Sequence, residues 1–543
     1  MTVLETVAWV KPPEPIRGLD HLGVQAPCIA LYGQLLPGIT NVTDRARYYS
    51  FYSWLLWSFE RRYSNHTVDE FRRVLRRAEC LFSLIAIRHA RVNGDNDEGL
   101  HGRAMVGRDK LLRIEEGKPF ALEDYASLEG QNRYFKNKLG ALGQYYFGPL
   151  RDLRVLDHHP GAGYPGYDKE RGRKLAEALV SAVPEDEFFR ILEQSTITWA
   201  ELDKLSSFCP CQLSANVVEH ELLLDLFLAR TPMFQGDGGT TRRASLALIL
   251  DLVGRSVSDP DYAFESLFRG GAYTRALFDG SPWQVAKTME PALRGWGTYQ
   301  RNELLSIAVQ GLFAAILRAI ERDEGRSIRR AGDAADIAVG LLSSRGEDLN
   351  ISLSAKIDRV RDELPALADW RHENHELQRG WRLQGLDLDD DGKIENVAGE
   401  SVAILLALLA RGVDEYPYGD FEIDQEYFDP REIHLLSFRQ TSSGEWSGMT
   451  VEAWIRWLAV QWGITRHLRV ALRKLRGERR DTFRIRPLED ELRVVEVPLP
   501  VFTQPRVGKA LQILRDVGLI DHGKGVIVLT QRGRIELEAC RAG

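Results

Sequence analysis

The sequence predicts a mainly α-helical, multi-lobed protein with a C-terminal winged-helix-like domain of mixed α and β structure. Apolar residues recur with helical spacing in most segments up to about residue 450. Residues 451–543 instead combine helical segments with short strand-like runs. We therefore expect an N-terminal helical domain at 1–200, a second helical domain at 201–450 and a basic winged-helix-like domain at 451–543.

The N-terminal domain is expected to centre on a buried aromatic helix. One face of this helix has i, i+3, i+4, i+7, i+11 spacing and carries Tyr48, Phe51, Tyr52, Leu55 and Phe59. Tyr49, Trp54 and Trp57 occupy the other side, so the helix is apolar nearly all round, which is typical of a buried helix. Further helices are expected at 68–90, 128–150, 169–183 and 185–193, with loops at 94–107 and 157–168.

The second domain is expected to consist of helices joined by polar segments. Apolar periodicity predicts helices at 219–229, 242–253, 303–320 and 402–409. Composition predicts a polar surface link at 325–336, an acidic turn at 386–396 and a loop-rich stretch at 412–448.

The C-terminal domain shows the element order of a winged helix. A helix at 451–462 is expected to stop at Gly463, and Thr465 is expected to cap a second helix at 466–475. Alternating residues predict a hairpin from 483–486 and 492–495. A helix at 505–517, a turn at 521–525, a strand at 526–529 and a closing helix at 530–539 complete the expected winged unit.

The charge distribution points to an anionic partner for this domain. The chain has 71 Lys and Arg against 78 Asp and Glu, whereas residues 452–543 have 18 against 11. This segment therefore carries +7 and the rest of the chain −14, which favours DNA, or RNA, as the ligand. The expected nucleic-acid-binding residues are Arg466, Arg469, Arg473, Lys474, Arg476, Arg479, Arg480, Arg484, Arg486, Arg506, Lys509 and Lys524. The alternative is a solvated basic face, or a winged helix used for protein contacts.

Four other arginines are candidates for an anion site or an internal structural role. Arg45 and Arg47 lie in the first turn of the aromatic helix, where the helix dipole disfavours cations, so each needs a carboxylate, carbonyl groups or a bound anion. Arg242 and Arg243 follow a Gly-rich segment at a helix start, which could hold a phosphate. That segment lacks the Gly-Lys-Ser/Thr of a P-loop, and an exposed loop is the simpler interpretation.

Metal and catalytic motifs are weak. Cys209 and Cys211 with His220 offer three soft ligands without an evident fourth, and Asp387–Asp391 match only the first half of a calcium loop. Arg151 with His158 and Arg154 with His159 resemble the Arg-x4–6-His spacing of helical HEPN ribonucleases, where such residues do acid–base work on RNA. Glu303 and the Arg371–His375 segment are further candidates, but surface or core roles are the simpler interpretation. We expect no catalytic residues, no metal and no cofactor.

Bulk features indicate a cytoplasmic protein. The sequence contains no run of eighteen apolar residues, so we expect no membrane span. Its five cysteines are few and scattered, which favours a reducing compartment. The N-terminal residues do not show the basic-then-apolar pattern of a signal peptide.

Three short blocks resemble a family of large helical bacterial proteins encoded in phage-defence and restriction islands. The first is Leu36-Pro37-Gly38-Ile39-Thr40 followed by Thr43 to Tyr49, which is similar to the family's opening pattern PG-x-[ST]…T-x-RARY. The others are Tyr299–Glu303 and Asp481–Arg486. The resemblance implies a setting beside ATPases, helicases or nucleases, and no activity.

These observations favour a non-catalytic DNA-binding or DNA-sensing subunit of an anti-phage defence complex. It would contact the phosphate backbone through its basic C-terminal domain, and mainly through residues 466–486, which contain nine Lys and Arg but only two acidic residues. The alternatives are a HEPN-like ribonuclease or toxin effector, and a protein-interaction scaffold without nucleic-acid contact.

Overall fold

Helices make up about 60% of the protein and strands about 6%. The computed structural model describes residues 20–94, 100–255, 262–323, 325–346, 348–385, 393–411, 432–478, 480–523 and 526–543. The mainly helical class expected from the sequence is thus confirmed, whereas a winged-helix domain is not established by these elements alone.

The chain forms two compact units, each assembled from three separate segments. Unit 1 comprises Met1–Leu31, Ser266–Gln284 and Arg294–Thr503, and unit 2 comprises Tyr32–Glu265, Val285–Leu293 and Gln504–Gly543. The expected division at 1–200, 201–450 and 451–543 follows sequence ranges rather than contacts, and it stays a prediction.

Unit 2 contains most of the N-terminal helices and the last two helices of the chain. Its elements are α2 (Arg47–Arg62), α3 (Val68–Val92), α4 (Arg108–Leu111), α5 (Glu123–Ala126), the π-helix η1 (Leu142–Tyr146), α6 (Phe147–Asp152), β1 (Leu156–His158), β2 (Pro165–Tyr167), α7 (Arg171–Val180), α8 (Glu185–Leu192), α9 (Trp199–Asp203), the 3-10 helices η2 (Ser206–Phe208) and η3 (Pro210–Ala215), α10 (Val217–Leu228), α11 (Pro232–Gln235), α12 (Gly239–Gly254), α22 (Val507–Asp516), β6 (Ile520–Gly523), β7 (Val526–Leu529) and α23 (Gln531–Ala542). Strands β1 and β2, which pair across the predicted loop 157–168, were not expected, and only residues 140–150 of the predicted helix 128–150 are helical.

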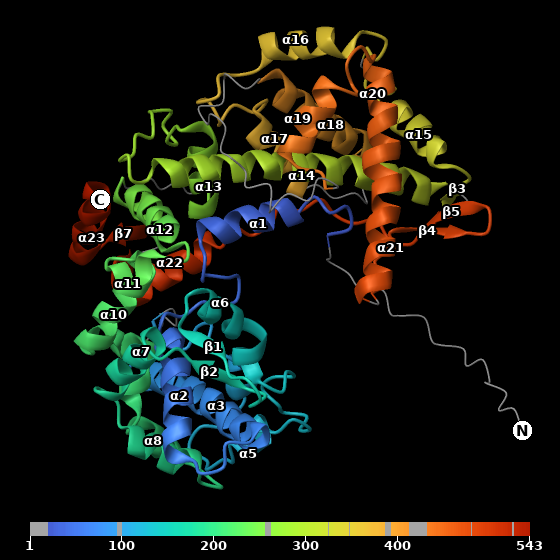
Figure 1. Cartoon of the computed structure of the whole chain (residues 1–543). Helices are drawn as coiled ribbons and strands as arrows, with labels where there is room; N and C mark the ends of the chain where they lie inside the picture. Colours follow the sequence, from blue (N-terminus) through green and yellow to red (C-terminus); the bar gives the residue numbers. More distant parts are fainter. Residues whose placement is uncertain are drawn as a thin grey trace, which may run out of the picture. The chain divides into compact units, whose positions relative to one another are not determined.

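The aromatic helix α2 is the centre of unit 2, as its sequence predicts. Tyr48, Tyr49, Phe51, Tyr52, Trp54, Leu55 and Phe59 are all fully buried. The rings of Phe51 and Phe82 stack with centroids 4.2 Å apart, which ties α2 to α3. In Figure 1, α2 and α3 (blue) lie among α5, α7 and α8. Burial of aromatic surface stabilises this core, because large apolar side chains are removed from water.

Unit 1 is built around the long helix α14 (Glu290–Arg322). Figure 1 shows α14 alongside α17, α18 and α19. Its other elements are α13 (Phe264–Thr274), β3 (Ser327–Ile328), α15 (Ala331–Ser343), α16 (Leu353–Glu363), α17 (Glu376–Gly385), α18 (Ile394–Ala410), α19 (Leu435–Ser443), α20 (Val451–Trp457), the π-helix η5 (Leu458–Thr465), α21 (Arg466–Glu478), β4 (Ile485–Leu488) and β5 (Glu491–Val494). The helix α1 (Ala26–Leu35) contains residues of both units.

Three details of unit 1 differ from the sequence expectation. The predicted polar link at 325–336 contains β3 and the start of α15, and α19 lies in the predicted loop region. Gly463 does not end a helix, because η5 continues α20 into α21 with π-helical turns. The calcium half-loop at Asp387–Asp391 lies outside the described residues, and the described end of the predicted acidic turn 386–396 begins helix α18.

The predicted β-hairpin near residue 490 is confirmed. Strand β5 pairs antiparallel with β4, with Ile485 opposite Val494. Strand β3 joins the other edge of β5, so that the sheet has the order β3-β5-β4.

The α14 helix is long and apolar enough to cross a membrane by length and composition alone. However, 89% of its most apolar window is buried inside the structure. Such burial is typical of the core helix of a soluble protein, because a lipid-facing helix would leave its apolar side chains exposed.

His467 on α21 connects the N-terminal segment to the β4–β5 sheet. Its Nδ1 is 2.9 Å from the carbonyl oxygen of His21, and the Arg484 backbone N–H donates to its Nε2 at 2.9 Å. The ring is therefore neutral, with the proton on Nδ1. Burial lowers the pKa of His467 to about 4.

This geometry predicts a loss of stability in acid. The unfolded chain takes up a proton near the ordinary His pKa of about 6.5, whereas the folded chain does so only near pH 4. The contribution of His467 is therefore present above pH 6.5 and lost as the pH falls towards 4, with a full size of about 3 kcal/mol. Urea unfolding at several pH values should show a smaller pH dependence in His467→Gln than in wild type. The exposed control His158→Gln should keep the wild-type pH dependence of stability. If His467→Gln also keeps the wild-type pH dependence, the predicted contribution of His467 is wrong.

Candidate nucleic-acid interface

The exposed side of α21 carries three arginines on one face. Arg469, Arg473 and Arg476 are spaced at i, i+4 and i+7, and all three are exposed. Among the described residues, Arg469 and Arg476 have no ion-pair partner, and Arg473 Nη1 is 3.6 Å from Oε1 of Glu432. We call these three side chains the α21 arginine face. Its positive charges face solvent, and only that of Arg473 has a carboxylate nearby among the described residues.

The opposite side of α21 holds two of the predicted binding residues inside unit 1. Arg466 is 5% exposed, and its Nε donates to the carbonyl oxygen of Leu22 at 2.6 Å. Burial, together with the charges of Arg473 and Arg469, lowers its pKa, although Glu432 opposes this. Lys474 donates to the carbonyl oxygen of Asp20. Arg466 is therefore not a surface residue, because it is needed to satisfy the backbone of the N-terminal segment.

The segment that follows α21 contributes less free charge than its composition suggests. Arg484 is 3% exposed and pairs with Glu496, and Arg486 pairs with Asp481. Arg480 is exposed. The candidates Arg479 and Lys524 lie outside the described residues.

The helix expected to enter a DNA groove makes internal contacts instead. Arg506 Nη1 donates to the carbonyl oxygen of Ile39 at 2.6 Å, and its guanidinium lies 4.7 Å from the ring centroid of Tyr32. Lys509 pairs with Asp44. In unit 2, these two half-buried side chains hold the 32–44 segment, and their contact with nucleic acid stays a prediction.

Arg45 and Arg47 are both fully engaged inside unit 2. Arg45 is 0% exposed, pairs with Asp516 at 2.9 Å, and donates to the carbonyl oxygens of Leu100, His101 and Arg103. Arg47 is 1% exposed, and its Nε and Nη2 bind the two carboxylate oxygens of Glu219. Its Nη1 donates to the carbonyl oxygens of Ser207 and Cys209, each at 2.6 Å. Carboxylates and carbonyls thus take the place of a bound anion.

Arg242 and Arg243 also contact protein groups. Arg242 is 1% exposed and donates to the carbonyl oxygens of Leu226, Phe227 and Pro37. Burial lowers its pKa to about 10, and no carboxylate among the described residues lies within ion-pair distance. Arg243 donates to the carbonyl oxygen of Ala539 at 2.9 Å. These contacts fix the start of α12, so the Gly-rich segment before it needs no phosphate.

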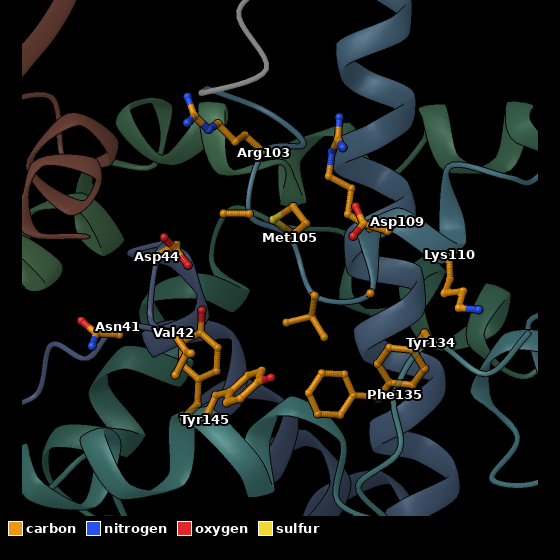
Figure 2. A pocket seen from close by; sticks show the side chains of 15 residues that line it. Asn41, Val42, Asp44, Arg103, Met105, Asp109, Lys110, Tyr134, Phe135 and Tyr145 are labelled. Carbon is orange, nitrogen blue, oxygen red and sulfur yellow. The ribbon is translucent and has the colours of Figure 1, made fainter. Parts of the chain in front are cut away.

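A pocket of about 870 Å³ opens in unit 2 beside the Asn41–Asp44 segment. Figure 2 shows the rings of Tyr134, Phe135 and Tyr145 along the lower side of the pocket, with Arg103 above them and Lys110 beside Tyr134. Behind this wall, Tyr134 donates a hydrogen bond to the fully buried Glu79, whose pKa is raised by burial. Asp44 and Asp109 also line the pocket, so it presents both charges beside the rings and selects no ligand charge.

The residues with ribonuclease-like spacing do not adopt the helical arrangement of that motif. His158 lies on the short strand β1, and His159 follows it. Both are exposed, and their rings contact Phe147 and Tyr164 respectively. Arg154 pairs with Asp237 at 2.8 Å. Glu303, the other acid considered, is fully buried and accepts hydrogen bonds from Thr503.

The predicted trio of soft ligands is only partly brought together. His220 lies away from the two cysteines, because its Nε2 is 2.9 Å from the carbonyl oxygen of Val517. His89 and His101 lie beside Cys209 and Cys211 instead. No spacing pattern points to these two histidines, because they are more than a hundred residues away from the cysteines along the chain.

Comparisons with known proteins found no match to the chain among protein families, curated proteins or solved structures.

Proposed function

We propose that this protein is a non-catalytic nucleic-acid-binding protein that contacts the phosphate backbone through the α21 arginine face. The observation that carries the proposal is the exposure of Arg469, Arg473 and Arg476 at helical spacing, with Glu432, 3.6 Å from Arg473, as their only ion-pair partner among the described residues. Phosphate oxygens are the ligands that such exposed guanidinium groups bind most readily.

Backbone contact fits this surface better than base-specific reading. Sequence reading needs side chains that enter a groove, and the expected reading residues Arg506 and Lys509 are engaged with Ile39 and Asp44. The order α22, β6, β7, α23 supports a winged-helix-like unit in which the helix makes protein contacts. We therefore expect strong salt dependence and little sequence preference.

The cellular setting is proposed from the resemblance of the 36–49 block. It supports a cytoplasmic subunit of an anti-phage defence complex, with ATPase, helicase or nuclease subunits as partners. In this role the protein would deliver or sense the nucleic acid on which a partner acts.

Neutralising the α21 arginine face should weaken binding without unfolding the protein. We expect the triple variant Arg469→Gln, Arg473→Gln, Arg476→Gln to lose at least about tenfold in affinity at 100 mM salt, because three phosphate contacts are removed. Fluorescence anisotropy with full-length protein and labelled duplex DNA, single-stranded DNA and duplex RNA measures this and ranks the ligands.

The matched control removes three exposed arginines from elsewhere in unit 1. Arg329, Arg359 and Arg371 are exposed, and their replacement by Gln changes the net charge equally. This control should bind within about twofold of wild type, because long-range charge effects are screened within roughly 10 Å at this salt. Equal losses in both variants, or no binding of wild type to any probe at low salt, would refute the proposal.

A further inference from the structure

Two histidines and two cysteines from distant segments converge beside the C-terminal end of α3 in unit 2. His89 lies in the last turn of α3, Cys209 lies between η2 and η3, and Cys211 lies in the first turn of η3. With His101 they offer four ligand atoms that all lie within 4.8 Å of one another. We call these four residues the Cys2His2 cluster. All five cysteines of the chain are free thiols, including this pair.

Two S–N distances inside the cluster are close to those of tetrahedral metal coordination. Cys211 Sγ is 3.2 Å from His89 Nδ1, and Cys209 Sγ is 3.5 Å from His101 Nδ1. Bond lengths of about 2.3 Å for Zn–S and about 2.0–2.1 Å for Zn–N place neighbouring S and N ligand atoms about 3.6 Å apart in a tetrahedron. These two pairs therefore match zinc coordination to within a few tenths of an ångström, and all four ligand atoms lie within 4.8 Å of one another.

The two arginines of the 45–47 segment hold the loops that carry the ligands. Arg45 donates to the carbonyl oxygen of His101 at 2.8 Å, and Arg47 donates to the carbonyl oxygen of Cys209 at 2.6 Å. Each arginine is buried and fixed by a carboxylate. The two arginines thus hold the ligand loops through the backbone carbonyl groups of those loops. Hydrogen bonds behind the ligands that fix their orientation are typical of metal sites.

The chemistry of the donors selects the ion. Two thiols and two imidazoles form a soft to borderline donor set, which suits Zn²⁺ and is a poor set for Mg²⁺ or Ca²⁺. Cysteine binds a metal ion as the thiolate, so the incoming cation would displace the protons of Cys209 and Cys211.

We propose that the Cys2His2 cluster binds one Zn²⁺ ion in a closed, tetrahedral, structural site. Four protein ligands leave no position for water or substrate, so the ion would stabilise unit 2 rather than perform catalysis. The complex of Zn²⁺ with two thiolates and two neutral imidazoles carries no net charge, which suits a mostly buried position. Binding exchanges one Zn²⁺ for the protons still held by the two thiols and needs no oxidant or reductant.

The first test uses the wild-type full-length protein. Inductively coupled plasma mass spectrometry of protein purified without chelator should find about one zinc per chain. After removal of zinc, Co²⁺ should give the visible absorption bands of a tetrahedral site and the near-ultraviolet charge-transfer band of thiolate ligands. A chain that neither retains zinc nor yields these cobalt bands, or one with a Cys209–Cys211 disulfide in place of metal, would overturn the proposal.

The second test changes single ligands. Cys211→Ser and His89→Gln alter half-buried residues, so the variants should still fold, and each should lower zinc affinity at least tenfold in a competition with a chromogenic chelator. The controls are Cys540→Ser and His158→Gln, which remove the same residue types elsewhere in unit 2 and should keep wild-type affinity. Circular dichroism checks separately that both ligand variants are folded. Wild-type zinc affinity in both folded variants would overturn the assignment of these ligands.

Discussion

Replacing Arg47 with methionine is expected to lower the free energy of unfolding of unit 2 by about 3–5 kcal/mol. The substitution leaves Glu219 fully buried without its cation, although Ser50 and Asn216 still donate to it. It also removes the donor to the carbonyl oxygens of Ser207 and Cys209. Urea unfolding followed by far-ultraviolet circular dichroism measures the loss.

The double variant Arg47→Met, Glu219→Leu separates the two causes. Removing both charges avoids the buried unpaired carboxylate, so we expect part of the stability to return. The exposed control Arg173→Met, on α7, should change stability by less than about 0.5 kcal/mol. A loss in Arg47→Met no larger than in this control would show that the pair does not hold α2 in place.

Truncating Trp54 to alanine is expected to have an effect of similar size. Trp54 is 0% exposed, and its ring centroid lies 5.0 Å from that of Phe188 and 5.2 Å from that of Phe208. Loss of an indole from such a core leaves a cavity and typically costs about 3–5 kcal/mol. Differential scanning calorimetry should show a lower transition temperature for unit 2.

The matched variant is Trp54→Phe. The indole Nε1 has no hydrogen-bond partner among the described residues, so phenylalanine sacrifices volume but no hydrogen bond. We expect a loss of about 1 kcal/mol, well below that of Trp54→Ala. Equal and small losses in the two variants would mean that the core refills around position 54.

Helical segments and the aromatic core could be predicted from the sequence because their signals are local. The i, i+3, i+4 spacing of Tyr48, Phe51 and Tyr52 reports burial within a single helix, and the structure confirms it. The stop expected at Gly463 was wrong, because the chain absorbs the irregularity in the π-helix η5. Glycine weakens a helix but does not end one when tertiary packing surrounds it.

The candidate sites could not be predicted as well, because they depend on contacts between distant residues. Net charge identified residues 466–486, but it could not show that Arg466 and Arg484 are buried while Arg469 and Arg476 face solvent. Cys209 and Cys211 were recognised as soft ligands, yet His220 was the wrong partner. His89 and His101 meet the cysteines only in the folded protein, where α3 packs against η2.

The most direct test of nucleic-acid binding by the α21 arginine face is the salt dependence of affinity for duplex DNA. The slope of log K against log salt concentration should be smaller in magnitude by about 2–3 in the triple variant at 469, 473 and 476 than in wild type, because each lost phosphate contact removes about 0.9 from it. The control variant at 329, 359 and 371 should keep the wild-type slope. Equal slopes in all three proteins would contradict the proposed interface.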